Sequence, residues 1–345
     1  MPDKRPLPDW DALSFRLTQT DCVYRAYGDT EKNPAWDKGE YLPFGDVSIS
    51  PAAAVLSYGI GIFEGLKAER TEDERILLFR PDRNALRFQN SARQMQMPPF
   101  PAEQFLSVVD EIVRKNERFI PPKGKGTFYI RPLQFAHEPI LGLRTCTQFE
   151  TLFYGSPVGA YFKGDESGVR LRVLNHGRVA PGGSGSAKAM GNYPAGIRAR
   201  MEWKEKGFDD VLYLDARHLK YATETSGSNV FALLKSGALV TPPLDDQILP
   251  GITRASVIEL AKDALSVKVE ERPLSLKEIL DEAQEVFCTG TAWTVRSVSE
   301  IVHEGGAKQF PKESLRSDLY DLIRDIQTGK TSDTRGWTRE VRSAK

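Results

Sequence analysis

The sequence predicts an α+β protein of two domains. At 345 residues the chain is about twice the length of an average domain. Short apolar strands and amphipathic helices follow one another along it without strict alternation. A polar, glycine-bearing stretch at residues 163–168 (KGDESG) has the composition of an interdomain linker. We therefore expect an N-terminal α+β domain at residues 1–164 and a C-terminal α+β domain at residues 165–345.

In the N-terminal half, apolar runs bounded by turn residues predict strands, and apolar residues at helical spacing predict helices. The expected strands lie at residues 76–79, 127–131, 150–154 and 158–162. The expected helices run from Pro81 to about Met95 and from Phe105 to Phe119. A Gly-Ser-Pro sequence at 155–157 predicts a bend between the last two strands, because glycine and proline commonly interrupt regular structure.

The C-terminal half shows the same mixture of short strands and helices. The expected strands lie at residues 169–174, 210–215, 230–234, 238–241 and 285–288. The expected helices lie at residues 195–206 and 251 to about 265, with a last one marked by apolar residues between Leu315 and Ile326. Lys235-Ser236-Gly237 separates two β-rich runs, which predicts a hairpin.

Composition excludes several classes of protein. The 47 basic and 47 acidic side chains give no net charge, which argues against an obligate nucleic-acid binder. Three widely separated cysteines without a CxxC motif, and four histidines at least 39 residues apart, predict neither a disulfide framework nor a metal site. Residues 1–11 lack the apolar core of a signal peptide, and the least charged stretch, at 47–63, is too broken for a spanning helix. A cytoplasmic location is the expectation.

Two glycine-rich segments could suggest a nucleotide site, but their spacing is imperfect. Residues 59–65 (GIGIFEG) have one residue too many between the last glycines for a dinucleotide fingerprint. Residues 182–188 (GGSGSAK) carry Ala187 where a phosphate-loop motif requires glycine before the lysine. Tight turns are the simpler interpretation, and a nucleotide-binding oxidoreductase is disfavoured.

Two other turns are better candidates for holding a phosphate. Residues 249–253 (LPGIT) open a helix, whose first N–H groups and positive dipole end suit an anion. Gly290-Thr291 follows a strand and offers N–H groups and a hydroxyl. Either turn alone is more often an ordinary cap, but together they can clamp one phosphate if the fold brings them together.

Lys188 is the residue that most suggests covalent chemistry. It lies among small residues (SGSAKAMG, 184–191), which let a planar ligand approach the backbone. A lysine amine that is kept partly neutral can attack an aldehyde and form a Schiff base. A lysine taken at random is normally a solvated surface residue, so the argument depends on context. Asn192-Tyr193 follows closely, and Glu224 lies in the polar run 223–229 (TETSGSN).

With these residues in place, the sequence resembles the branched-chain amino acid aminotransferases. These enzymes use pyridoxal 5′-phosphate (PLP) and have the fold-type-IV, aminodeoxychorismate lyase-like architecture. The resemblance runs from Tyr58 to the C-terminal helix. It rests on YGIGIFEGLKA (58–68), LLFRP (77–81), YIRP (129–132), SPVGAYF (156–162), KAMGNY (188–193), TETSGSNVF (223–231), TPPLDDQILPGITR (241–254) and FCTGTA (287–292). It implies two α+β domains with the cofactor at their interface, and a homodimer.

The resemblance assigns the groups that hold and use the cofactor. Lys188 should carry PLP and, once displaced by substrate, should move the proton between the substrate's Cα and the cofactor's C4′. Glu224 should pair with the pyridine nitrogen, since a ring protonated there can accept the carbanion's charge. Tyr193 should hydrogen-bond the phenolic oxygen.

The phosphate should be bound by charge and by backbone donors. The resemblance implies charge-assisted hydrogen bonds from Arg80. The backbone N–H groups of Ile252 and Thr253 and the hydroxyl of Thr291 should complete the cradle. Leu249 should pack on the ring face, although a leucine is more often simply part of the core.

The substrate pocket must accept an apolar branched side chain and, in the second half-reaction, the charged chain of glutamate. By resemblance, Tyr58, Phe63 and Tyr129 form much of its wall, because aromatic rings exclude water while phenol groups still offer hydrogen bonds. Arg131 should meet the distal carboxylate. The turn Thr291-Ala292 should receive the α-carboxylate.

The implied activity is reversible amino transfer between L-leucine, L-isoleucine or L-valine and 2-oxoglutarate by a ping-pong scheme. Within the same fold, a D-amino-acid aminotransferase or an aminodeoxychorismate lyase is the alternative, and a PLP-binding regulatory protein without catalysis is a more distant one. The FCTGTAWTVRSV stretch contains no cysteine pair, so the CxxC redox switch of mammalian relatives is not expected. Trp293 follows the carboxylate turn, where smaller residues are common, so it bears on side-chain preference.

Overall fold

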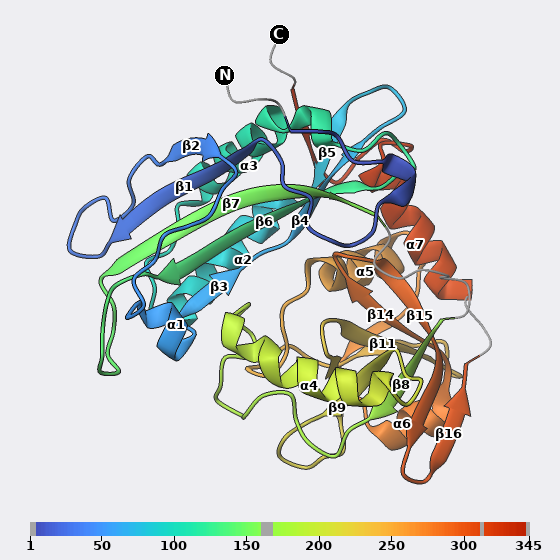
Figure 1. Cartoon of the computed structure of the whole chain (residues 1–345). Helices are drawn as coiled ribbons and strands as arrows, with labels where there is room; N and C mark the ends of the chain where they lie inside the picture. The colour runs from blue at the N-terminus through green and yellow to red at the C-terminus, as the bar shows by residue number, and fades with distance from the viewer. Residues whose placement is uncertain (1–4, 160–167, 311–313, 343–345) are drawn as a thin grey trace. The chain divides into compact units, whose positions relative to one another are not determined.

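Two β-sheets, each within its own compact unit, organise the chain (Figure 1). The computed structural model describes residues 5–159, 168–310 and 314–342. The first unit comprises Met1–Tyr161, Ala187–Gly191 and Asp325–Lys345, and the second comprises Phe162–Ser186 and Asn192–Arg324. The predicted boundary after residue 164, with most of the predicted linker, lies outside the described residues. Lys188, which we expected to be carried by the C-terminal domain, is grouped with the first unit.

The first unit contains an eight-stranded sheet in the order β17-β5-β4-β6-β7-β1-β2, with β3 also pairing with β6. Its strands are β1 (Cys22–Asp29), β2 (Glu40–Pro43), β3 (Gly61–Phe63), β4 (Leu66–Arg70), β5 (Ile76–Phe79), β6 (Thr127–Ala136), β7 (Gln148–Val158) and β17 (Thr338–Val341). Its helices are α1 (Ala54–Tyr58), α2 (Pro81–Gln94) and α3 (Ala102–Lys115), with short 3-10 turns at Trp10–Ala12 and Glu117–Phe119.

An aromatic core joins α2 and α3 to this sheet. Phe88 of α2, Phe105 of α3 and Phe153 of β7 are each fully buried, and the centroids of the Phe105 and Phe153 rings lie 5.1 Å apart. Helix α2 matches its predicted position, whereas α3 begins at Ala102 and ends at Lys115, before the predicted end at Phe119. The apolar residues of α3 that predicted a helix are buried in this core. The packing fixes α2 against the strands, which matters for the site because α2 also contacts β3.

The bend predicted at residues 155–157 is wrong, since β7 continues without interruption from Gln148 to Val158. Gly155, Ser156 and Pro157 pair with Ile130, Tyr129 and Phe128 of β6. Pro157 is tolerated there because β1 pairs with β7 only as far as Phe153, so among the described strands none pairs with Pro157 on that side. Gly155 is required by packing, since a Cβ there would collide with the Phe128 ring.

The second unit contains a nine-stranded sheet in which a β10–β11 pairing closes part of the path into a small barrel. Its strands are β8 (Val169–Val173), β9 (Asp210–Leu214), β10 (Ala222–Thr225), β11 (Asn229–Leu234), β12 (Leu239–Thr241), β13 (Val269–Glu271), β14 (Ala283–Gly290), β15 (Thr294–His303) and β16 (Gly306–Gln309). Its helices are α4 (Tyr193–Lys204), α5 (Ile252–Asp263) and α6 (Leu276–Glu282), with a 3-10 turn at Met190–Asn192. The long helix α7 (Ser314–Gln327) begins in this unit and ends in the first.

The strands and turns of the barrel carry several of the residues that matter for function. β10 carries Glu224, and its partner across the β10–β11 turn is Asn229. The predicted hairpin is confirmed, with Leu234 N donating to Ala238 O at 2.9 Å where β11 turns back toward β12. None of the helices in the described ranges is long and apolar enough to cross a membrane.

Candidate active site

Lys188 is bound to the first unit through its backbone. Phe63 N donates to Lys188 O at 3.1 Å, and Lys188 N donates to Ser91 Oγ at 3.0 Å. Ala189 forms an isolated antiparallel bridge with Ile62 of β3. Ala187 and Ala189 are 2% and 1% exposed, whereas the lysine between them is half-buried. The small neighbours noted in the sequence therefore allow this segment to pack closely against β3.

The amine of Lys188 lies against an aromatic ring. Its Nζ is 4.6 Å from the centroid of the Phe63 ring. The Arg131 guanidinium lies 4.8 Å from the same centroid, so one ring contacts two cationic groups. Such contacts are attractive because the face of the ring is electron-rich. Two residues that the resemblance assigned to cofactor and substrate thus share one aromatic partner.

Phe63, Tyr129 and Arg131, three of the residues predicted to bind the substrate, come together in the first unit. Arg131 Nη2 donates to Tyr129 Oη at 3.4 Å, and its guanidinium lies 5.3 Å from the Tyr129 ring centroid. Tyr129 leans over Gly65, where any Cβ would collide with the phenol oxygen, so this position needs glycine. Tyr58 differs: it is 38% exposed and its hydroxyl donates to Leu141 O at 2.5 Å.

A buried carboxylate that we did not predict lies next to Phe63. Glu64 is fully buried, and its Oε1 and Oε2 accept from Arg87 Nε at 2.6 Å and Arg87 Nη2 at 2.8 Å. Asn84 Nδ2 donates to Oε2 at 2.7 Å. Burial raises the pKa of Glu64, but the Arg87 guanidinium, helped by the charge of Lys188, outweighs that effect and lowers the pKa overall. These contacts therefore favour the ionised form of Glu64.

Arg80, the predicted phosphate ligand, occupies a constrained position at the start of α2. Its φ of 49° is left-handed, and its N donates to Trp337 O at 2.6 Å. Its guanidinium carbon lies 4.4 Å from the centroid of the Trp337 ring. The side chain is 4% exposed. Trp337 comes just before β17, so the C-terminal segment helps to fix an arginine more than 250 residues away.

In the second unit, Glu224 is held by donors from three segments. Its Oε1 accepts from Asn229 Nδ2 at 2.8 Å and from Leu249 N at 3.0 Å. Its Oε2 forms an ion pair with Arg178 Nη2 at 2.8 Å. Both charged side chains are buried, at 6% and 9% exposed. Donors on both oxygens stabilise the ionised form, which is the form that a protonated ring nitrogen requires.

Sequence reasoning missed Arg178. Its Nη2 also donates to Gly185 O at 3.0 Å and to Gln247 O at 2.8 Å, so one guanidinium joins three segments. Arg178 belongs to the run HGRVAPGG (176–183). The only signal in the sequence that could have identified it is its position ten residues before Lys188. Asn229 was part of a quoted motif without an assigned role.

The two predicted phosphate turns both belong to the second unit. α5 begins at Ile252, so the N–H groups of Ile252 and Thr253 fall in its first turn and have no helical acceptor. Gly251 precedes them without a capping side chain, and a Cβ there would collide with Asn229 Oδ1. Leu249 contributes its backbone to Glu224, as described above. Thr291 lies in the β14–β15 turn.

The remaining predicted residues lie at the ends of elements. Ala292 and Trp293 complete the β14–β15 turn, and the Trp293 ring folds back so that a Cβ on Gly290 would lie 3.3 Å from it. Tyr193 is the first residue of α4 and is half-buried. The preceding Asn192 is fixed by Ser184, whose Oγ donates to Asn192 Oδ1 at 2.7 Å.

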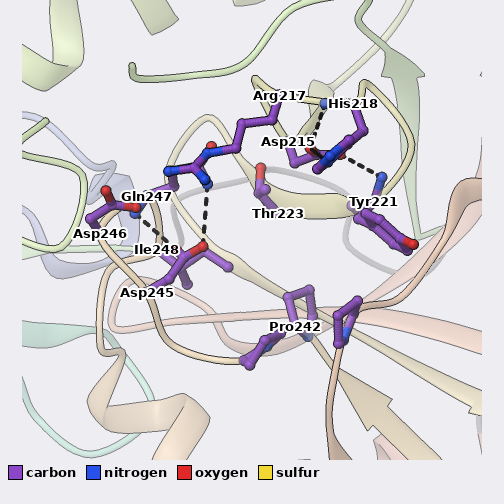
Figure 2. A pocket seen from close by; sticks show the side chains of 13 residues that line it. Asp215, Arg217, His218, Tyr221, Thr223, Pro242, Asp245, Asp246, Gln247 and Ile248 are labelled. Atoms are coloured by element: carbon purple, nitrogen blue, oxygen red, sulfur yellow. Dashed lines mark hydrogen bonds and ion pairs between the residues drawn. The ribbon is translucent and has the colours of Figure 1, made fainter. Parts of the chain in front are cut away.

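A cavity of about 370 Å³ in the second unit is separate from these residues. Figure 2 shows Asp215, Thr223, Gln247 and Ile248 around it. Thr223 and Ile248 are chain neighbours of Glu224 and Leu249, but the cavity is not lined by any predicted site residue. Asp215 accepts hydrogen bonds from its own loop, and Gln247 Oε1 accepts from Ala216 N at 3.3 Å. The polar side chains around the cavity therefore hold neighbouring loops by hydrogen bonds. The cavity is not part of the candidate active site.

Comparison with known proteins identifies the family of this chain. A family model described as amino-transferase class IV matches residues 61–301, well over half of the chain. This chain belongs to the class IV aminotransferases. Among curated class IV relatives, a mitochondrial branched-chain amino acid aminotransferase of Humulus lupulus is 43% identical over 336 residues, which cover 96% of this chain and 84% of the relative. A methionine aminotransferase (BCAT4) of Arabidopsis thaliana is 41% identical over 354 residues, covering 99% and 98%.

Solved class IV structures share the fold. The branched-chain aminotransferase of the archaeon Thermoproteus uzoniensis aligns with a TM-score of 0.79 and 28% identity, over 94% of this chain and all of that one. Another solved branched-chain aminotransferase, 29% identical, contains pyridoxamine 5′-phosphate. The predicted membership of the branched-chain amino acid aminotransferases, the α+β fold, the activity of that group and the dependence on PLP are confirmed. Amino acids and 2-oxo acids are the substrates.

The residues described above fit PLP by the chemistry of their donors. The first unit supplies an amine with a fixed backbone in Lys188 and a buried guanidinium in Arg80. The second unit supplies a buried carboxylate held by an arginine, and a glycine-led helix start whose first N–H groups suit a phosphate. An aldehyde, a pyridine nitrogen and a phosphate each have a matching group.

Proposed function

We propose that this branched-chain amino acid aminotransferase passes the amino group of L-leucine, L-isoleucine or L-valine to 2-oxoglutarate, with Lys188 as its catalytic residue. The observation that carries the proposal is the placement of Lys188, whose backbone is bound on both sides while its amine lies over the Phe63 ring. PLP, when bound, supplies an aldehyde that receives the amino group and a ring that accepts the electron pair released at Cα.

The residues proposed to bind PLP have different roles. The amine of Lys188 removes the proton from the substrate's Cα and returns one at the cofactor's C4′. Glu224 holds the proton at the ring nitrogen, because its carboxylate is fixed by Arg178 and Asn229 in the ionised state. Tyr193 donates to the phenolic oxygen.

The phosphate is proposed to lie among donors that need an anion. Arg80 contributes a guanidinium, Ile252 and Thr253 contribute first-turn N–H groups, and Thr291 contributes a hydroxyl. Leu249 packs on the ring face and, through its N–H, also fixes Glu224. The chain is proposed to divide into two domains near residue 164.

The substrate is proposed to bind against an aromatic wall with one charged end. Phe63, Tyr129 and Tyr58 surround the apolar side chain of leucine, isoleucine or valine. When 2-oxoglutarate binds instead, its distal carboxylate meets Arg131 and the adjacent Tyr129 hydroxyl. The turn Thr291-Ala292 receives the α-carboxylate in both half-reactions.

Methionine is a second candidate substrate. The observation that favours it is the methionine aminotransferase relative, which is 41% identical and aligned over nearly its whole length. Methionine is unbranched and flexible, so an apolar wall that accepts leucine can accept it as well. Kinetics with leucine, isoleucine, valine and methionine, each as L and D enantiomer, decide between these substrates. Turnover of D enantiomers or lyase activity would instead favour another enzyme of this fold.

Borohydride reduction of the loaded enzyme tests the central assignment. Reduction should fix the cofactor on Lys188, and the labelled peptide identifies the lysine by mass spectrometry. Lys188→Ala should abolish turnover and labelling. Lys308 is the matched control, since it is partly buried and desolvation lowers its pKa, which makes it the rival amine. Lys308→Ala should retain both; label on Lys308 would refute the proposal.

Assembly and location are part of the same proposal. We propose a homodimer, on the basis of the family resemblance, and a location in the cytoplasm. Plant relatives are named mitochondrial or chloroplastic, so location needs its own measurement. Light scattering of the purified protein measures its mass, and fractionation of the source cells measures its location. A monomer mass near 38.6 kDa would refute the dimer.

A further inference from the structure

The backbone N–H and C=O of Lys188 are both hydrogen-bonded to residues far away in sequence. Ser91, which is 1% exposed, accepts from Lys188 N at 3.0 Å, and Phe63 N donates to Lys188 O at 3.1 Å. We propose that Ser91 is a positioning residue for Lys188, which holds the backbone of the lysine in one place while its amine leaves and rejoins the cofactor. This inference rests on the proposed role of Lys188.

One face of α2 provides the anchor. Asn84, Arg87 and Ser91 are spaced three and four residues apart, so they follow one another along a single side of the helix. All three are buried, at 2%, 8% and 1% exposed. Ser91 binds Lys188 directly. Asn84 and Arg87 bind Glu64, whose chain neighbour Phe63 supplies the other hydrogen bond to Lys188.

The backbone of Lys188 is the part of this residue that can be fixed without restraining its amine. Ala187 and Ala189 have no polar side-chain atoms, and the Lys188 side chain must itself move during the reaction. The backbone N–H and C=O are therefore the groups through which the lysine can be fixed without restraining its amine. Accurate placement matters because reacting atoms must approach to roughly 3–3.5 Å, and a misplacement of about 1 Å can cost about a hundredfold in rate.

The test compares three serine variants of the full-length enzyme. Ser91→Ala removes the acceptor, and Ser91→Thr retains a hydroxyl. Ser275→Ala is the control, because Ser275 Oγ also accepts a backbone N–H, from Glu278 at 3.1 Å, but caps α6 in the second unit. Two readouts are used: hydrogen exchange of the Lys188 amide in the loaded enzyme, and the rate at which added PLP becomes attached to Lys188 in the cofactor-stripped chain.

The proposal expects a specific pattern. Ser91→Ala should speed exchange of the Lys188 amide and slow attachment of PLP, each by roughly tenfold, the equilibrium factor for one ordinary hydrogen bond. Ser91→Thr should restore both rates, and Ser275→Ala should change neither. Unchanged attachment in Ser91→Ala, with the label on Lys188, overturns the positioning role alone. Label on another lysine overturns the proposed function as well.

The wild-type enzyme provides a measurement that does not depend on any variant. The added methyl of Ser91→Thr can disturb packing, in which case this variant does not restore the two rates. A lower melting temperature of the variant identifies that case. Exchange in the wild type then decides: a Lys188 amide protected like those of β3 supports the anchor, and one that exchanges like an exposed loop amide overturns it.

Discussion

Arg178 and Glu224 form a buried ion pair in which Nη2 lies 2.8 Å from Oε2. The carboxylate is further bound by Asn229 and by Leu249 N, and the guanidinium by the carbonyls of Gly185 and Gln247. Buried charges are tolerated when their remaining hydrogen-bonding positions are satisfied in this way. These contacts therefore hold the Glu224 carboxylate in one place, in the position proposed to face the ring nitrogen.

Glu224→Gln should slow proton removal from the substrate far more than it weakens substrate binding. The amide keeps the shape of the side chain but cannot hold a proton on the ring nitrogen, so the carbanion charge is less well accepted. Single-turnover rates with leucine deuterated at Cα measure proton removal, and the dissociation constant is measured separately. Equal effects on both would contradict the assigned role.

Arg178→Gln should destabilise the folded protein by about 3–5 kcal/mol, because it leaves the Glu224 carboxylate buried without its charge partner. Denaturant unfolding measures this loss. Arg170→Gln is the matched control: Arg170 pairs with Glu300 at 2.8 Å, but its side chain is 46% exposed. Surface pairs contribute about 0–1 kcal/mol. A loss for Arg178→Gln no larger than that of the control would show that the pair contributes little.

Arg131→Met should weaken binding of 2-oxoglutarate without weakening binding of leucine. We expect KM for 2-oxoglutarate to rise by about tenfold to a hundredfold, the range for losing a hydrogen bond to a charged group. The KM for leucine should change little, because its side chain carries no charge. Leucine serves as the internal control in the same preparation. Parallel increases for both substrates would indicate instead that Arg131 supports the shape of the Phe63 and Tyr129 wall.

Asp215→Asn should lower the free energy of unfolding at neutral pH but not in acid. Burial raises the pKa of Asp215, but the N–H groups of Tyr221, Lys220 and His218 outweigh it and bring the pKa to about 2. Figure 2 shows Asp215 beside His218 and Tyr221. Because this folded pKa lies below the unfolded value, the carboxylate stabilises the fold above about pH 4, by about 2 kcal/mol, and that contribution is lost as pH falls toward 2.

Urea unfolding of wild type and variant at several pH values measures this dependence. The difference between the two proteins should be largest near pH 7 and should shrink on acidification. A difference that stayed constant down to about pH 2.5 would mean that the loss comes from packing and not from the ionised carboxylate.

Cys288 should not react with alkylating agents in the folded enzyme. It is 3% exposed, and burial raises its pKa to about 12, so the reactive thiolate is scarce at neutral pH. N-ethylmaleimide followed by peptide mass spectrometry measures labelling at each cysteine. The same treatment in guanidinium chloride provides the control, in which all three cysteines should react. Rapid labelling of native Cys288 would contradict its burial.

Local sequence predicted the five longest helices but not α1 or α6, and it predicted fewer than half of the strands in the described residues. The family motifs singled out Lys188, Glu224 and Arg80 as candidate site residues. Local sequence failed at residues 155–157, where a proline predicted a bend inside a continuous strand. A local rule could not know that β1 ends its pairing at Phe153, so that Pro157 is paired only with β6 among the described strands. Proline does lack the N–H that a central strand needs, but the tertiary structure places Pro157 where that N–H is not needed.

The partners of the site residues were not predictable in the same way. Ser91 lies 97 residues from Lys188, and Arg178 lies 46 residues from Glu224. Neither belongs to a motif whose chemistry is visible in the sequence. Their roles come from hydrogen bonds that exist only after α2 has packed beside β3, and after the loop before Lys188 has reached Glu224.

The order of residues determined which chemistry this protein can perform, because a lysine among small residues, a carboxylate in a polar turn and a glycine-led helix start are properties of short segments. Tertiary structure decided how those groups are held. Hydrogen bonds and ion pairs act over about 3 Å, and folding alone brings residues separated by tens of positions within that range.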